Sequence, residues 1–195
     1  MGYTYIDTGA LYRGVAYVAR QKGISAEDDS ALAAMCADLK LDFSVHADGS
    51  RLVANGIDVT DHIRTPEITM LASAVSARPV IRAYLLDLQR ELGRRKAAVF
   101  EGRDMGTVVF PEAEAKFFLD ASPQTRAARR YQELAHLKSQ SLADVQRDMA
   151  RRDANDSSRA VAPLKPAPDA IHIDSSTLTI EAVVSQMLDH IKNLN

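Results

Sequence analysis

The residues best able to do chemistry follow the apolar run 97–101, in the order Gly102, Arg103 and Asp104, with Gly106 close behind. The glycines let the backbone approach a ligand closely. The planar fork of arginine matches phosphate oxygens, and a carboxylate accepts hydrogen bonds from N–H donors. We expect the apolar run to be a buried parallel strand whose carboxyl end opens into a ligand-binding loop. The plainer alternative is a tight turn with a surface ion pair.

Other charged residues are predicted to lie in loops at strand ends or next to them. Arginines that converge without an equal number of acids indicate a polyanionic ligand such as a phosphate. No Ser–His, Cys–His or paired-carboxylate pattern accompanies them, and phosphoryl transfer needs none, because positioning and charge stabilisation supply most of its catalysis. The chemistry that fits is a kinase for a small phosphorylated acceptor, although each single arginine can also be a solvated surface residue. The candidates are Asp7, Thr8, Arg13, Arg103, Asp104, Arg152, Asp156 and Arg159.

The elements that must position these residues alternate between strands and helices, which predicts an α/β fold with a parallel sheet. Between them, residues 41–59 alternate in polarity around Asn55-Gly56, a strong hairpin signal, and predict a small antiparallel insertion. We expect strands at 3–7, 97–101, 115–119 and 170–174, and helices at 10–22, 27–38, 65–76, 79–94, from 122 onward, 142–152 and 179–193. Residues 136–141 are predicted to be a polar, hinge-like break.

Length and composition place the chain among ordinary globular proteins. Its 195 residues suit one domain, and a net charge of −2 creates no general attraction to nucleic acid or membranes. Cys36, the single cysteine, cannot form an internal disulfide, and it lies in an apolar helical run where we expect a core residue in a reducing, cytoplasmic compartment. The five histidines show no metal-ligand spacing, so we expect no structural metal.

Essentially the whole chain resembles the bacterial cytidylate kinases of the nucleoside monophosphate kinase group. The segments that carry the resemblance are Ile6–Arg13, Gly102–Pro111, Phe118–Ser122, Arg126–Arg130, Ser158–Leu164 and Asp174–Ser176. The resemblance implies a P-loop NTPase-like parallel sheet, ATP with Mg²⁺ as the phosphate donor, and CMP or dCMP as the acceptor. It implies a monomer that binds neither nucleic acid nor membranes. It divides the single domain, residues 1–195, into a core (1–40, 95–121 and 160–195), a monophosphate-binding insertion (41–94) and a lid (122–159).

The resemblance also implies roles for individual residues. Asp104 would accept a hydrogen bond from the cytosine amino group, while Arg82 and Ser73 would donate to the other edge of the base. Uracil carries an oxygen in place of that amino group and would be rejected. Arg13, Arg103 and Arg159, with Thr8, would hold the acceptor phosphate. Arg152 and Asp156 would meet the ribose, and Arg126 and Arg130 are lid candidates for the donor nucleotide. Arg103, Arg152 and Arg159 are the expected catalytic residues.

One departure from the family pattern matters. Nucleotide kinases of this group carry a Gly-rich Walker A loop that cradles the donor phosphates, and this chain contains no G-x-x-x-x-G-K-[ST] motif and no Gly-Lys pair. We therefore expect an N-terminally truncated chain, without its first strand, P-loop and first helix, and inactive or nearly so. The alternatives are a catalytically silent CMP-binding module and a related kinase for UMP or another small acceptor.

Overall fold

The computed structural model describes residues 2–46, 49–95, 97–134 and 141–194, and it divides into two compact units after Met105. Unit 1 contains β1 (Thr4–Asp7), α1 (Thr8–Gln21), α2 (Asp29–Asp38), β2 (Leu41–His46), β3 (Gly49–Ala54), β4 (Ile57–Asp58), α3 (Pro66–Ser76), α4 (Pro79–Arg94) and β5 (Ala98–Glu101). The π-helical turn η1 (Met105–Val109) follows. Unit 2 contains β6 (Phe117–Asp120), α5 (Pro123–Leu134), α6 (Leu142–Ser158), β7 (Ile171–Asp174) and α7 (Ile180–Lys192).

Unit 1 combines a parallel strand pair with an antiparallel sheet. β1 pairs with β5 in parallel, with Ile6 opposite Phe100 and Asp7 opposite Glu101. β2, β3 and β4 form the predicted antiparallel sheet. Asn55 and Gly56 both have positive φ, 50° and 83°, which is the conformation that a two-residue hairpin of this twist requires. The Asn-Gly prediction is therefore confirmed.

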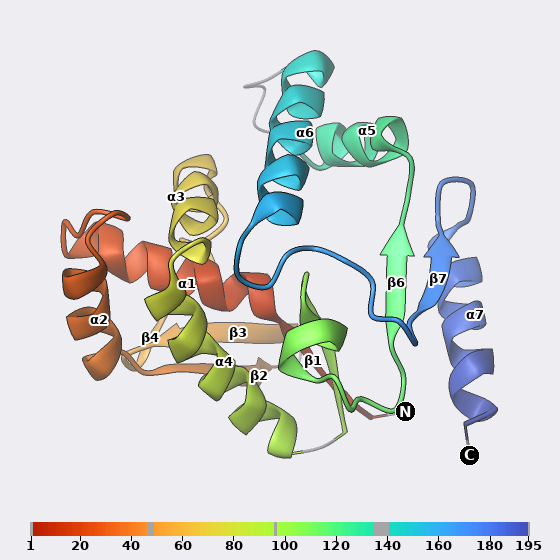
Figure 1. Ribbon diagram of the computed structural model, residues 1–195, viewed down its shortest axis with the longest axis horizontal. Coiled ribbons are helices and arrows are strands. Elements are labelled where there is room, and N and C mark those ends of the chain that lie inside the picture. Colours follow the sequence, from red (N-terminus) through yellow and green to blue (C-terminus); the bar gives the residue numbers. More distant parts are fainter. Residues whose placement is uncertain (1, 47–48, 96, 135–140, 195) are drawn as a thin grey trace. The chain divides into compact units, whose positions relative to one another are not determined.

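The helices of unit 1 begin where the sequence provides caps, and they bury one face each. The Asp7 side chain caps α1 and the Thr65 side chain caps α3, where Pro66 occupies the first turn. α1 contacts α3, α4 and β3, and Figure 1 shows α1 to α4 gathered around the antiparallel sheet. The fully buried core side chains of this unit include Leu11, Val15, Leu32, Leu52, Ile81 and Leu85.

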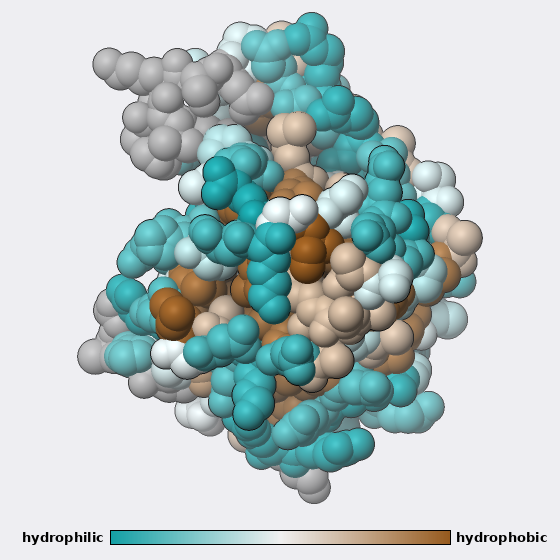
Figure 2. Space-filling model, turned by 90° about the vertical axis from the view of Figure 1, so that its left-hand side faces the viewer, coloured by the Kyte–Doolittle hydropathy of each residue, from teal (hydrophilic) through white to brown (hydrophobic). Residues whose placement is uncertain are grey.

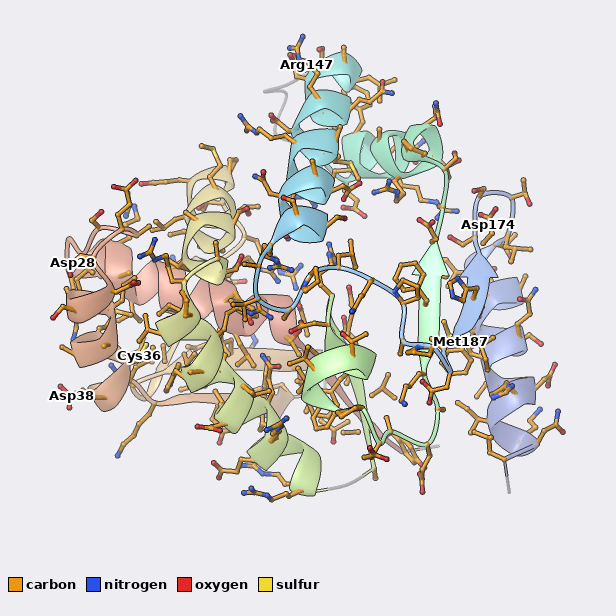
Figure 3. The ribbon with its side chains drawn as sticks, viewed as in Figure 1. Asp28, Cys36, Asp38, Arg147, Asp174 and Met187 are labelled. Carbon is orange, nitrogen blue, oxygen red and sulfur yellow. The ribbon has the colours of Figure 1, made fainter. Side chains whose placement is uncertain are left out.

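Unit 2 is built on the parallel pair β6–β7, with α7 following β7 and the contacting helices α5 and α6 following β6 (Figure 1). Together with β1–β5, it confirms the predicted α/β fold with parallel strands and flanking helices. The parallel strands form separate pairs in the two units. Asp174 lies at the end of β7 (Figure 3), where its carboxylate accepts a hydrogen bond from the Ser176 amide at 2.8 Å and closes the turn toward α7.

Two expectations about these elements were wrong. The strand at 97–101 is not buried on both faces: Ala98 and Phe100 pack on the core, whereas Val99 is 53% exposed, because β1 is the only described strand beside β5 and one face of the pair covers the core. The helix expected at 142–152 continues to Ser158. Its polar second half contains no helix breaker, and Ser141 with Asp144 forms a capping box that starts the helix firmly.

Cys36 is buried in α2, as expected, and burial raises the pKa of its thiol. Figure 3 shows it between Asp28 and Asp38, which lie at the two ends of that helix. The face drawn in Figure 2 is mostly hydrophilic with scattered apolar patches. The predicted hinge at 136–141 falls almost entirely outside the described residues, and within it only Ser141 is described.

Candidate functional site

Asp7 organises the carboxyl end of β1. Its Oδ1 accepts the Ala10 amide at 3.0 Å and so caps α1, while its Oδ2 accepts the Arg13 guanidinium at 2.7 Å. Arg64, from the segment before α3, reaches the same oxygen at 3.5 Å. A Cβ at Gly9 would lie 3.0 Å from Asp7 Oδ1 and 3.2 Å from Arg13 Nη1, so the glycine leaves room for this ion pair. Two guanidinium groups thus share one carboxylate at a helix N-terminus.

Thr8 ties the start of α1 to the end of β5. Its side chain is 2% exposed, and its hydroxyl donates to the Glu101 carbonyl at 2.6 Å. On the other side of Glu101, the Tyr5 hydroxyl donates to the Glu101 carboxylate, and burial together with that carboxylate raises the Tyr5 pKa. The Thr8 proton is therefore committed to the backbone of β5, so its first effect is to fix the loop that carries Gly102, Arg103 and Asp104.

Gly102 leaves no room for a side chain at this junction. An added Cβ would lie 2.6 Å from Thr8 Oγ1 and 2.8 Å from Met105 side-chain atoms. We expect Gly102→Ala to destabilise unit 1 by about 1–3 kcal/mol through overpacking, measured by chemical unfolding. The matched test is the same substitution in a Thr8→Ala background, where the cost should fall because the closest contact is gone. An equal cost in both backgrounds would contradict a Thr8 clash.

Arg82 and Asp104 form a buried ion pair in unit 1. Their side chains are 8% and 6% exposed, and a guanidinium nitrogen of Arg82 contacts Asp104 Oδ2 directly. The guanidinium also donates to the Ser76 carbonyl at 3.2 Å and lies over the Tyr12 ring, 5.7 Å from its centroid. The structure thus brings two of the three predicted base-recognition residues together. A buried charge pair needs such additional partners to offset its desolvation.

The remaining predicted residues of unit 1 are Ser73 on α3 and Arg103 in the loop after β5. Ser73 is half-buried on α3, and its carbonyl accepts from Ser76 Oγ at 2.8 Å. Arg103 is exposed between Gly102 and the buried Asp104. Gly102 packs closely against the Thr8 and Met105 side chains, so the backbone from which the Arg103 side chain extends is held in place.

In unit 2, the predicted lid arginines bind neighbouring groups of α5 and α6. Arg126 donates to the Ala121 carbonyl at 2.9 Å and pairs with Asp153 of α6. Arg130 pairs with Glu133 one turn further along α5. Arg129, which shares the basic stretch, instead donates to both the hydroxyl and the carbonyl of buried Ser175 and fixes the turn after β7.

A second cluster in unit 2 gathers the predicted ribose and phosphate residues. Asp156 is buried on the last turns of α6 rather than in the expected loop, since the helix runs on to Ser158. Arg152 lies 4.0 Å and Arg159 3.6 Å from its carboxylate. The Nε and Nη2 atoms of Arg159 are buried without a hydrogen-bond partner among the described residues. The cluster therefore brings two guanidinium groups to one buried carboxylate.

Sequence reasoning missed two residues near Asp7. Tyr5 and Arg64 line a cavity of about 230 Å³, together with Asp7, Phe43, Ser50 and Thr60. Arg64 stands alone in a loop before Thr65-Pro66, a pattern that reads as a helix start, so nothing in its spacing marks it. Only the fold of the insertion against the end of β1 brings it to the carboxylate.

Helix N-termini are common anion-binding sites, so their occupancy limits where a further phosphate could bind. In the described parts of the chain, side chains of Asp7, Asp28, Thr65, Ser122, Ser141 and Thr179 already accept amides of the first turns of six helices. The seventh, α4, begins at Pro79 after Arg78. None of these starts is a glycine-rich loop with a lysine. The described residues also contain no group of three or more acidic, His or Cys side chains arranged for a metal ion, and none of their helices is long and apolar enough to cross a membrane.

Comparison with known proteins gives the family directly. Residues 1–193 match the family model described as cytidylate kinase. The cytidylate kinase of Geobacter sulfurreducens is 50% identical over 96% of this chain and 81% of its own length, and that of Citrifermentans bemidjiense is 47% identical over 98% and 83%. A bifunctional pantoate ligase/cytidylate kinase of a Synechococcus species is 45% identical over 96% of this chain and 37% of its own length. The chain belongs to the cytidylate kinase family.

Proposed function

We propose that the chain binds CMP or dCMP as the phosphate acceptor of a cytidylate kinase, with Asp104 and Arg82 reading the base. The observation that carries the proposal is the buried contact between these two side chains. Cytosine presents an amino donor beside two acceptors, so a carboxylate next to a guanidinium is its complement. Ser73 lies on α3, the helix before the one that carries Arg82, and supplies a further donor to the acceptor atoms of the cytosine base.

The acceptor phosphate is assigned to Arg13, Arg103 and Arg159. Arg13 is held by Asp7 at 2.7 Å, and Arg159 keeps two buried nitrogens without a partner among the described residues. Guanidinium groups with donors to spare suit the several oxygens of a phosphate monoester. Thr8 supports the site through its bond to Glu101.

The ribose is assigned to Arg152 and Asp156 of α6, where Arg152 Nε lies 4.0 Å from Asp156 Oδ2. Arg126 and Arg130 of α5 remain the candidates for the donor nucleotide. In this proposal residues 122–159 act as a lid and 41–94 as the monophosphate-binding insertion of one domain, and Arg103, Arg152 and Arg159 stabilise the charge of the transferring group.

The donor, ATP with Mg²⁺ in the family, is not accommodated by these 195 residues alone. Its phosphates need a glycine-rich backbone cradle and a lysine. The sequence contains no glycine-rich loop that ends in a lysine, and side chains already cap six of the seven described helix starts, α4 being the exception. We therefore propose that this chain binds the acceptor and turns over slowly or not at all. The same observation favours the second candidate, a catalytically silent CMP-binding module.

The proposal also includes a cytoplasmic monomer that binds neither nucleic acid nor membranes. The net charge of −2 supports only the part on nucleic acid, since a protein that neutralises many of its phosphates gathers an excess of Lys and Arg.

The test of the acceptor assignment compares ligands in thermal unfolding. CMP and dCMP should raise the unfolding midpoint, by an amount equivalent to about 2.7 kcal/mol at a hundredfold excess over Kd. UMP at the same concentration should protect far less, because the buried Asp104 carboxylate would face a carbonyl oxygen. Equal protection by UMP would make the role of Asp104 wrong and favour the UMP kinase reading. If none of the three nucleotides raises the unfolding midpoint, the proposed acceptor site is wrong.

A further inference from the structure

We propose that Arg64 is a further ligand of the acceptor phosphate, held in reserve over the end of β1 by Asp7; the proposal rests on the function proposed above. Arg64 lies outside every motif of the sequence that carries the nucleotide chemistry. It enters from the segment between β4 and α3, within the part of the chain assigned to the monophosphate.

The geometry places Arg64 beside a residue already assigned to the phosphate. Arg13 Nη2 and Arg64 Nη2 approach the same oxygen, Asp7 Oδ2, at 2.7 and 3.5 Å. Two nitrogens that share one oxygen are close enough for one phosphate group to bridge them. The first turn of α1 lies at the same point, but its Ala10 amide is already bonded to Asp7, so the attraction for an anion comes from the two guanidinium groups.

The charges at this point leave a surplus that a phosphate can use. Asp7 is a single carboxylate facing two guanidinium groups, and it also accepts the Ala10 amide. Its shorter contact goes to Arg13, whose side chain is 17% exposed. Arg64 makes the longer contact and has a side chain that is 69% exposed. Exposed ion pairs of this kind contribute little, so Arg64 can exchange Asp7 for a phosphate at small cost.

There is also space for that exchange. Arg64 lines the cavity of about 230 Å³, and the other lining residues include the polar Ser50 and Thr60 and the apolar Leu52 and Ile63. The Thr60 hydroxyl accepts the Leu52 amide at 2.8 Å, which fixes that side of the cavity. The Arg64 guanidinium thus borders an open volume in which it can turn from Asp7 toward a phosphate.

The experiment measures the affinities of CMP and cytidine for the whole chain by titration calorimetry. Arg64→Ala should weaken CMP binding about tenfold or more, because a charge-assisted hydrogen bond is lost, and should leave cytidine binding unchanged. Arg64→Lys keeps the charge without the fork and should fall between the wild type and Arg64→Ala. The control, Arg94→Ala, removes the same charge from an exposed position in unit 1 and should leave both affinities within about twofold.

Each other outcome has a distinct meaning. If Arg64→Ala binds CMP as tightly as Arg94→Ala does, Arg64 is no phosphate ligand and the proposal is overturned while the acceptor assignment stands. If Arg64→Ala weakens cytidine as much as CMP, the effect does not pass through the phosphate, and the proposal is again overturned. If the wild-type chain itself fails to bind CMP, the function proposed above is what fails.

Discussion

Incubating the 195-residue chain with ATP, Mg²⁺ and CMP is expected to yield almost no CDP. Phosphoryl transfer depends on positioning and charge stabilisation, and the donor phosphates normally obtain both from the backbone amides and lysine of a Walker A loop. The chain has no such motif, and six of its seven described helix starts are occupied by side-chain caps. We expect turnover at least a thousandfold below the roughly 1–100 per second that is typical of kinases, measured by coupled ADP release.

The positive control is the Geobacter sulfurreducens cytidylate kinase, which is 50% identical and of which this chain covers 81%. Calorimetry of CMP binding to both proteins separates loss of the donor site from misfolding: this chain should bind CMP and still fail to turn over. Turnover comparable to that of the control protein would show that other residues hold the donor phosphates, and would refute the expectation that this chain is inactive without a Walker A motif.

Replacing Asp104 by alanine is expected to destabilise unit 1 by about 3–5 kcal/mol, because it leaves the Arg82 charge buried without its carboxylate. Both side chains are less than a tenth exposed, so water cannot take the place of the lost partner. The measurement is the free energy of unfolding in urea. Asp38→Ala is the matched control, since it removes an exposed carboxylate at the end of α2 and should change stability by less than about 0.5 kcal/mol.

Two further variants separate structure from recognition. Arg82→Met combined with Asp104→Leu removes both charges and should recover much of the lost stability, as replacement of a whole buried pair by apolar groups often does. Asp104→Asn keeps an acceptor and adds an amide donor, so it should narrow the preference for CMP over UMP. Stability that is unchanged in Asp104→Ala would contradict the buried pair, and unchanged preference in Asp104→Asn would contradict its contact with the base.

Much of the local structure follows from the sequence because short-range chemistry decides it. Asn55-Gly56 fixed the hairpin, since those residues tolerate positive φ. The start of α3 is set by Thr65, whose side chain caps the first turn, and by Pro66, whose fixed φ suits that turn. The motifs around Asp7 and Gly102 also indicated the family correctly, because they are specific in both type and order.

Prediction from local sequence failed where the burial of a segment differs from what its composition suggests. Residues 153–158 are polar and read as a loop, yet they complete α6, in which Asp156 is buried beside Arg152 and Arg159. The run 97–101 is apolar and read as fully buried, yet Val99 is half exposed. In both cases burial depends on which neighbours cover a segment, and the residues of the segment do not encode that.

The sequence by itself therefore determined the residue types of the site, the strands and helices that carry them, and the family. Only the tertiary structure decided the pairings: Arg82 with Asp104, Thr8 with the Glu101 carbonyl, and Arg64 with Asp7. The last of these joins residues 57 positions apart in the chain. The physical reason is that an ion pair or hydrogen bond depends on distances of a few ångströms, and between distant segments such distances are set by the packing of the whole unit.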